Sequence, residues 1–283
     1  MTTRPVRVLC IGGSDSGAGA GIQADIKTAA ALGAYAMTAI TAVTAQNTLD
    51  VISVHPVPPD IVRAQIMACL DDIGADAVKI GMLHSSAIVD VVADVLRERA
   101  ARIPLVLDPV LVATSGTPLL DEAGIALLRE KLIPRATLVT PNLPEAERLT
   151  GIACGNDAAI VDAGRALIAL GANAALIKGG HGSDETLRDI LVTREGYGVF
   201  PHARQKTPHT HGTGCTLATA IAVGLAERRE LRPAVLRARA FVQHAISFAP
   251  GLGHGKGPLE HNFAQERGRT DLDCWGMTWI TRR

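Results

Sequence analysis

Residues 6–33, VRVLCIGGSDSGAGAGIQADIKTAAALG, join an apolar run to a glycine-rich stretch and then to an amphipathic segment. The run VRVLCI is typical of a buried β-strand, and Ile22, Ile26 and Ala29 recur at helical spacing until Gly33. This order of strand, turn and helix predicts the first unit of a parallel sheet that is covered by helices.

The same alternation continues along most of the chain. Further strands are expected at YAMTAITAVTA (35–45), AVKI (77–80), LVLDP (105–109), TLVTP (137–141) and AALIKGG (174–180), with a hairpin at 189–200. Helices are expected from about residues 59, 87, 144, 157, 214 and 232. No proline-rich linker or internal repeat interrupts the pattern, so we expect one α/β domain over residues 1–263 and a polar tail of unassigned role at 264–283.

Composition narrows the classes of partner. The 283 residues carry 28 Lys and Arg against 28 Asp and Glu, and only 3% are aromatic, so neither charge nor stacking platforms favour nucleic acid. No segment approaches the roughly 18 apolar residues of a membrane span. Five cysteines without a CxxC pair fit a reducing compartment. We therefore expect a cytoplasmic protein that binds neither nucleic acid nor membrane.

The glycine-rich stretch after the first strand is neither a dinucleotide fingerprint nor a P-loop. Ile22 stands where the sixth position of GxGxxG would need glycine, and Ile26 precedes Lys27-Thr28 where a Walker loop would need glycine. Glycines here let the backbone approach a ligand closely, although a tight turn between strand and helix explains them equally simply. Both interpretations stay open from these residues alone.

Acidic and amide side chains follow two of the expected strands. Ligands of open parallel sheets bind beyond the carboxyl ends of strands, where Asp108, Asn142 and Glu145 stand. One or two carboxylates, completed by water and phosphate oxygens, are typical Mg²⁺ ligands in kinases. Helix capping by Asn142 and Glu145 would produce the same pattern and is the alternative.

Lys178 ends the strand AALIK and precedes Gly179-Gly180. A lysine at this edge of the sheet can reach toward phosphate charge, whereas a solvated surface lysine is the ordinary alternative. The glycine pair clears space beside the ammonium group, which favours the phosphate-binding interpretation.

The stretch THGTGCTLATAIAVGLAE (210–227) places glycines where a long apolar helix begins. Gly212 and Gly214 leave the first N–H groups of the helix open, and a helix N-terminus with free donors is an anion site. We expect the same field to lower the pKa of Cys215 from about 8.5, which would make it a general base or a polar orienting group. The alternative for Cys215 is a small buried apolar residue.

Seven stretches together resemble the hydroxymethylpyrimidine and phosphomethylpyrimidine kinases of thiamine synthesis, within the ribokinase-like superfamily. They are GSDSGAGAGIQADIKT, TAVTAQNT, VKIGML, LDPVLVATSG, TPNLPEA, IKGGH and THGTGCTLATAIA, in the family's order between about residues 4 and 263. The resemblance implies a three-layer α/β/α sandwich with a mostly parallel central sheet. It also implies transfer of phosphate from ATP, with Mg²⁺, to a pyrimidine hydroxymethyl group, and a homodimer.

The resemblance also implies roles for individual residues. Gly13, Asp25, Gln46 and Met82 match the family's pyrimidine pocket, where the amide of Gln46 could pair with a ring nitrogen and an amine. Asn142, Glu145 and Lys178 match nucleotide-side positions, and Asp108 and Glu145 are the expected metal ligands. Gly212, Thr213, Gly214 and Cys215 match the anion hole at the transferring phosphate.

Two other functions compete with this interpretation. Many superfamily members have aspartate where Cys215 stands, and cysteine there is shared by the pyrimidine kinases and a related group of bacterial pyridoxal kinases, so pyridoxal is the main competing substrate. A catalytically silent metabolite sensor is the third hypothesis. It is disfavoured because Asp108, Glu145, Lys178 and Cys215 are all present.

Overall fold

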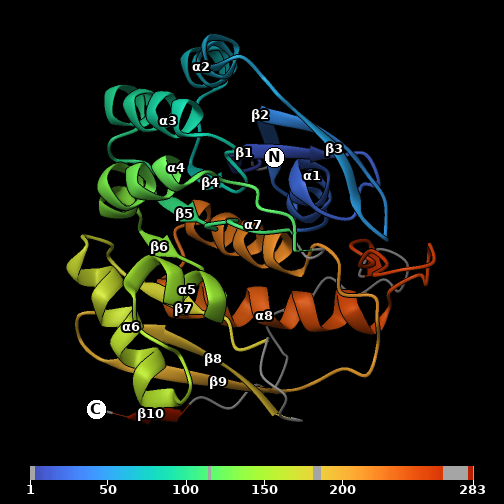
Figure 1. The fold of residues 1–283 in the computed structure, drawn as a ribbon, viewed down its shortest axis with the longest axis vertical. Coiled ribbons are helices and arrows are strands. Elements are labelled where there is room, and N and C mark those ends of the chain that lie inside the picture. Colours follow the sequence, from blue (N-terminus) through green and yellow to red (C-terminus); the bar gives the residue numbers. More distant parts are fainter. Residues whose placement is uncertain (1–3, 114–115, 181–185, 264–279, 283) are drawn as a thin grey trace.

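One β-sheet runs through the protein (Figure 1). The computed structural model describes residues 4–113, 116–180, 186–263 and 280–282, in which ten strands lie in the order β10-β9-β8-β7-β6-β5-β4-β1-β2-β3. Their bounds are β1 Arg7–Asp15, β2 Tyr35–Gln46, β3 Val51–Pro56, β4 Ala77–Ile80, β5 Leu105–Leu107, β6 Leu138–Val139, β7 Ala175–Ile177, β8 Thr186–Val192, β9 Tyr197–Ala203 and β10 Ile280–Arg282. The six neighbouring strands β2, β1, β4, β5, β6 and β7 pair in parallel. Strand β3 at one edge and β8 to β10 at the other pair antiparallel.

Helices cover both faces of the sheet. One face carries α1 (Gly21–Ala31), α7 (Thr213–Ala226) and α8 (Leu231–Ser247), and the other carries α2 (Pro59–Ala68), α3 (Ser86–Arg99), α4 (Glu122–Leu127), α5 (Leu143–Thr150) and α6 (Asp157–Ala169). The three-layer α/β/α arrangement expected from the sequence is confirmed. Within the described ranges, no helix has the length and hydropathy that a membrane crossing requires.

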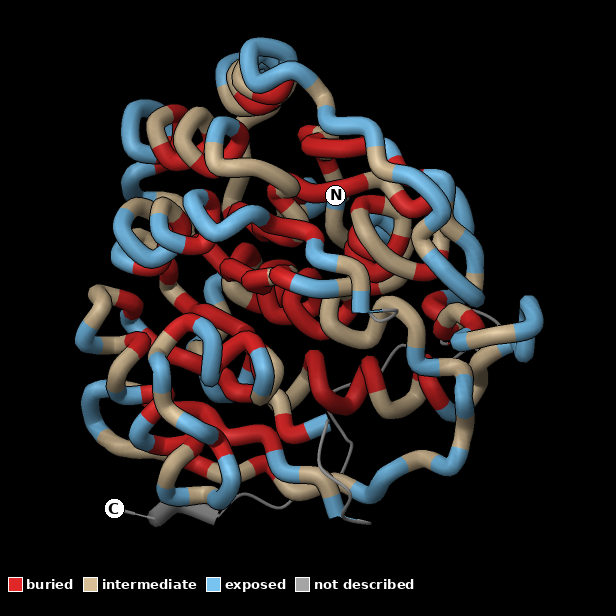
Figure 2. The backbone as a smooth tube through the Cα atoms, in the orientation of Figure 1, coloured by how far each residue is buried: buried red, intermediate tan, exposed pale blue. Residues whose placement is uncertain are grey.

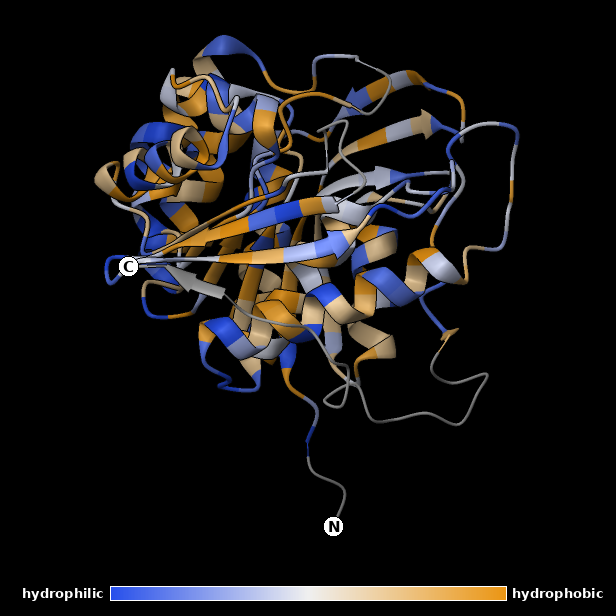
Figure 3. Ribbon diagram, turned by 90° about the horizontal axis from the view of Figure 1, so that it is seen from below, coloured by the Kyte–Doolittle hydropathy of each residue, from blue (hydrophilic) through white to orange (hydrophobic). Residues whose placement is uncertain are grey.

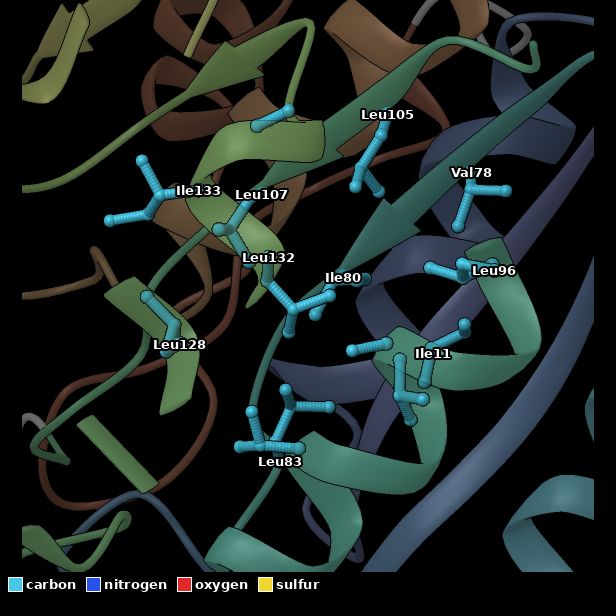
Figure 4. Close-up of a cluster of buried hydrophobic side chains, with 14 of the residues drawn as sticks. Ile11, Val78, Ile80, Leu83, Leu96, Leu105, Leu107, Leu128, Leu132 and Ile133 are labelled. Atoms are coloured by element: carbon cyan, nitrogen blue, oxygen red, sulfur yellow. The ribbon is translucent and has the colours of Figure 1, made fainter. Parts of the chain in front are cut away.

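The core lies in two main layers, one on each side of the sheet. Side chains alternate along β1, so that Leu9 and Ile11 join the cluster under α2 and α3, while Val8 and Cys10 join the cluster under α1, α7 and α8. Figure 4 shows the first cluster converging between the sheet and α3. The central strands β1, β4, β5, β6 and β7 are buried along most of their length (Figure 2), and Figure 3 shows the apolar residues concentrated in the same interior.

The structure contains elements that the sequence pattern did not predict. Strand β3 was missed because it lies at an edge and most of its side chains are exposed, which removes the apolar alternation. Helix α4 was missed because it is only six residues long. Strand β1 continues beyond VRVLCI to Asp15 because its pairing with β2 resumes after an irregularity between Gly12 and Ser14.

The division into a domain at 1–263 and a tail at 264–283 stays a prediction. Residues 264–279 lie outside the described part of the chain. Residues Ile280–Arg282 form β10, which pairs antiparallel with β9 at the edge of the sheet.

The packing predicts a large stability loss for Phe241→Ala. Phe241 is fully buried on α8, and its ring centroid lies 5.2 Å from that of Phe263. We expect a fall of about 3–5 kcal/mol in the free energy of unfolding, because truncation removes buried area and leaves a cavity. Denaturant unfolding measures this change. Ile61→Ala, at a side chain 48% exposed on α2, is the matched control and should change stability by about 0.5 kcal/mol or less; equal losses in the two variants would contradict the packing.

Candidate active site

A large cavity opens where the central parallel strands end. Its volume is about 1120 Å³, and loops that follow β1, β4, β5, β6 and β7 contribute to its wall. The twelve residues that the sequence predicted for the site all line it: Gly13, Asp25, Gln46, Met82, Asp108, Asn142, Glu145, Lys178, Gly212, Thr213, Gly214 and Cys215. The fold therefore brings these residues together, while their individual roles stay predictions.

The N-terminus of α7 faces the middle of the cavity. Gly212 is the N-cap with φ of 84°, a left-handed conformation that favours glycine, and no side chain caps the helix. A Cβ atom on Gly214 would lie 3.3 Å from Lys178 Nζ and 3.4 Å from Asp108 Oδ2. The open backbone donors thus adjoin a lysine and a carboxylate, as expected of a site for phosphate.

Lys178 and Asp108 form an ion pair at the ends of β7 and β5. Lys178 Nζ lies 2.7 Å from Asp108 Oδ1, and the hydroxyl of Thr140 donates to the same oxygen at 3.0 Å. Burial alone would lower the pKa of Lys178, but the charges of Asp108 and Glu145 raise it above its ordinary value. Lys178 is therefore a fixed cation in the cavity wall and not a solvated surface lysine.

Asn142 and Glu145 form a capping box at the start of α5. The Glu145 N–H donates to Asn142 Oδ1 at 2.8 Å, and the Asn142 N–H donates to Glu145 Oε2 at 2.8 Å. Burial raises the pKa of Glu145 to about 7; Lys178 opposes this shift and Asp108 adds to it. The predicted helix capping by Asn142 and Glu145 is therefore confirmed. The carboxylate of Glu145 also lines the cavity.

Asp25 belongs to a buried network in the cavity wall. Lys79 Nζ lies 2.8 and 2.9 Å from the two carboxylate oxygens of Asp25, and the Thr219 hydroxyl donates to Oδ1 at 2.7 Å. Because Asp25 is fully buried and its hydrogen bonds go to protein groups, its predicted contact with a substrate hydrogen stays a prediction. Lys79 was not predicted, although a lysine inside the apolar strand AVKI is an available signal.

The predicted ring-binding residues Gly13, Gln46 and Met82 form another part of the cavity wall. Met82 Sδ would lie 2.9 Å from a Cβ atom on Gly13, so the thioether occupies the space that a side chain there would need. Gln46 lies in the same wall, and its amide Nε2 is 3.3 Å from His211 Nε2. These residues leave a partly apolar surface with one amide group, which suits a polar heteroaromatic ring.

The sequence pattern did not predict roles for Asp15 and His211, although both stand in the glycine-rich stretches at the end of β1 and before α7. His211 Nε2 lies 2.9 Å from Asp15 Oδ2, and Asp15 also accepts from the N–H groups of Gly17, Gly19 and Ala20. Burial would raise the pKa of Asp15, but His211 and the backbone donors lower it below its usual value. A lone charged residue among glycines is the signal that could have identified them.

The far end of the cavity holds a second missed pair. Arg239 Nη1 on α8 lies 2.8 Å from Asp189 Oδ2 on β8, and Asp189 Oδ1 accepts from the Gly179 N–H at 2.8 Å. Both side chains are buried and line the cavity. The pair joins β8 of the hairpin to α8 in the cavity wall.

The expected lowering of the Cys215 pKa is wrong. Burial raises the pKa of the thiol to about 11; Lys79 acts in the opposite direction, and the charges of Asp25 and Asp108 add to the increase. A helix N-terminus contributes about 1 kcal/mol, less than one pKa unit, so burial outweighs it. Cys215 is a neutral thiol at pH 7, which favours a polar orienting role over a thiolate base.

This pKa predicts how Cys215 reacts with iodoacetamide. Only the thiolate reacts, and raising the pH should keep increasing the alkylation rate up to about pH 11, whereas an ordinary thiol levels off about one unit above its pKa of about 8.5. Mass spectrometry of the Cys215 peptide across a pH series measures the rate, with a small peptide thiol as reference. A rate that levels off between pH 7 and 9 would show that the helix field outweighs burial.

The chain is similar in sequence to named kinases. It is 45% identical to the hydroxymethylpyrimidine/phosphomethylpyrimidine kinase of Haemophilus influenzae, over 90% of this chain and 96% of that protein. It is 46% identical, over 92% of its length, to the thiamine biosynthesis bifunctional protein ThiED of Geobacter sulfurreducens, and it spans about half of that longer relative (53%).

Solved structures of kinases align with this chain over most of its length. A phosphomethylpyrimidine kinase from Clostridium difficile aligns with a TM-score of 0.76 at 40% identity, over 85% of this chain and 99% of that one. A pyridoxal kinase from Bacillus subtilis in complex with ADP aligns with a TM-score of 0.86 at 35% identity, over 93% and 99% of the two chains. The family model described as phosphomethylpyrimidine kinase matches residues 15–260. With this match over most of its length, the chain belongs to the phosphomethylpyrimidine kinase family.

Proposed function

We propose that the protein is a kinase that transfers phosphate from ATP to 4-amino-5-hydroxymethyl-2-methylpyrimidine and then to the resulting monophosphate, for thiamine biosynthesis. One observation carries the proposal. The open N-terminus of α7 and the Lys178–Asp108 pair share one cavity with a ring-sized wall at Gln46 and Met82. An anion site beside a heteroaromatic site is what phosphate transfer to a ring alcohol requires.

Two groups of residues in the cavity wall bind the ring and the nucleotide. Gly13, Gln46 and Met82 hold the ring, while Asn142 and Lys178 lie on the nucleotide side. The backbone donors at the start of α7 would stabilise the negative oxygens of the transferring phosphate. A neutral thiol at Cys215 suits this place because a thiolate would repel the same oxygens.

Asp108 and Glu145 fit a magnesium ion. Mg²⁺ takes one or two carboxylates together with water and phosphate oxygens, and it neutralises phosphate charge when bound. Burial and the charge of Asp108 raise the pKa of Glu145, which shows that the two carboxylates are near enough to interact. Water and phosphate oxygens would supply the remaining ligands.

A homodimer is part of the same proposal. Val43, Leu49 and Ile52 are 48%, 64% and 72% exposed on or beside the edge strand β3 and its neighbour β2. Exposed apolar side chains grouped at a sheet edge support an interface between copies of the chain.

The direct test is product analysis by mass spectrometry. The purified protein is incubated with Mg-ATP and either the hydroxymethylpyrimidine or pyridoxal, and mono- and diphosphate products are followed over time. A pyrimidine monophosphate followed by a diphosphate is expected. Pyridoxal 5′-phosphate as the only product would move the protein to the alternative, vitamin B6 salvage, which the cysteine-type anion hole and the similarity to pyridoxal kinases favour as a second candidate. Binding of the pyrimidine without ATP consumption would support the sensor hypothesis.

Asp108→Asn is predicted to impair both catalysis and metal use. We expect kcat to fall about 10²–10³-fold, because the change removes a carboxylate beside the anion site and leaves Lys178 without its charge partner. The Mg²⁺ concentration for half-maximal rate should rise at least about tenfold. Asp90→Asn, at an exposed residue paired with Lys131, is the control. Steady-state rates over a Mg²⁺ series measure both effects, and wild-type metal dependence in Asp108→Asn would contradict the assigned role.

A further inference from the structure

The Gln46 amide lies between two groups whose proton positions are determined by other contacts. Its Nε2 lies 3.3 Å from His211 Nε2, and its Oε1 lies 3.3 Å from Thr44 Oγ1. His211 and Asp15 are nearly buried, with side chains 12% and 3% exposed. Few water molecules can therefore compete for the hydrogen bond between Asp15 and His211.

The proton on His211 is fixed by Asp15. The pKa of Asp15 is lowered, so its carboxyl group is ionised at neutral pH and can only accept hydrogen bonds. With 2.9 Å between Asp15 Oδ2 and His211 Nε2, this ring nitrogen must carry a hydrogen. A protonated Nε2 has no lone pair, so a Gln46 NH₂ group would meet it hydrogen to hydrogen, whereas the amide oxygen can share the N–H with Asp15 in a three-centre hydrogen bond.

The proton on Thr44 is fixed in the same way. Its hydroxyl has one hydrogen, which it donates to the Ser14 carbonyl at 2.8 Å. Toward Gln46 it can therefore only accept, so it needs the amide NH₂ group. His211 and Thr44 lie at opposite ends of the amide, and both require the same assignment of those ends.

We infer that the Asp15–His211 pair and Thr44 fix the Gln46 amide with Oε1 toward His211 and Nε2 toward Thr44. The two ends of an amide have the same shape and are told apart by their partners, so this orientation is half a turn from the one in the contacts above. His211 is thus a positioning residue. It determines the order in which Gln46 presents an acceptor and a donor to the cavity.

This order selects between two classes of ring, an inference that rests on the proposed function because it places the ring against Gln46. In the aminopyrimidine, the atom group next to the hydroxymethyl-bearing carbon is an amine donor, followed by a ring-nitrogen acceptor. In pyridoxal, an aldehyde acceptor in that place is followed by a phenolic oxygen that is ionised at neutral pH and also accepts. An amide fixed to match the aminopyrimidine turns its oxygen toward the pyridoxal aldehyde, acceptor to acceptor, whereas a freely turning amide can present its NH₂ group there.

The test compares His211→Leu with His211→Gln. Leucine removes the donor to Gln46, whereas the glutamine NH₂ group has two hydrogens and can reach both Asp15 and Gln46. The readouts are the KM of the hydroxymethylpyrimidine and the inhibition constant of pyridoxal as a competing ligand. For His211→Leu we expect the pyrimidine KM to rise at least tenfold and the preference for pyrimidine over pyridoxal to fall at least tenfold. His211→Gln should stay within about threefold of wild type in both.

A double-mutant cycle separates positioning from a general packing effect. If His211 acts through Gln46, His211→Leu should change the pyrimidine KM less than twofold in a Gln46→Ala background. An unchanged KM in His211→Leu, equal losses in the leucine and glutamine variants, or a full loss in the Gln46→Ala background would each overturn the inference. Wild-type protein that forms no pyrimidine phosphate would reject the proposed function itself, and the inference with it, before any variant is measured.

Discussion

The site depends on the contact between two glycine backbones from distant parts of the chain. A Cβ atom on Gly212 would lie 1.8 Å from the carbonyl oxygen of Gly19, so no side chain fits between the start of α7 and the loop after β1. The left-handed φ of Gly212 gives a second reason for glycine. The contact between Gly212 and Gly19 places the first N–H groups of α7 at the cavity. It also places His211 beside Gly19 and Asp15. The anion site and the ring site are therefore built on one backbone contact.

Charge in the site is balanced in buried pairs. Lys79 with Asp25 and Lys178 with Asp108 lie in or under the cavity wall, and each ion is stabilised only because its partner is present. The opposing charges largely cancel beyond the pairs, which leaves the backbone donors of α7 as the directed positive element. The neutral thiol of Cys215 is consistent with this arrangement, because burial among balanced pairs disfavours another charge.

The sequence predicts the layers and the lining of the site because both follow from local patterns. Parallel strands end at a common edge, so polar residues that follow them, such as Asp108 and Lys178, must meet there. It does not predict the pKa of Cys215, because that value depends on burial by segments far away in sequence. It does not reveal the hydrogen bond between His211 and Asp15 either, because 196 positions separate them and only the contact of α7 with the first loop joins them.

Substrate choice in such a fold must depend on a few polar atoms. Pyridoxal kinases share the architecture, so the backbone alone does not separate a pyridine from an aminopyrimidine. A ring with an acceptor in place of the amine would face the Gln46 amide oxygen acceptor to acceptor, and an unsatisfied buried polar group costs about 1–3 kcal/mol. Discrimination then comes mainly from the penalty on the wrong ring. That penalty exists only while the amide is unable to turn, and a buried carboxylate acting through one imidazole provides this constraint.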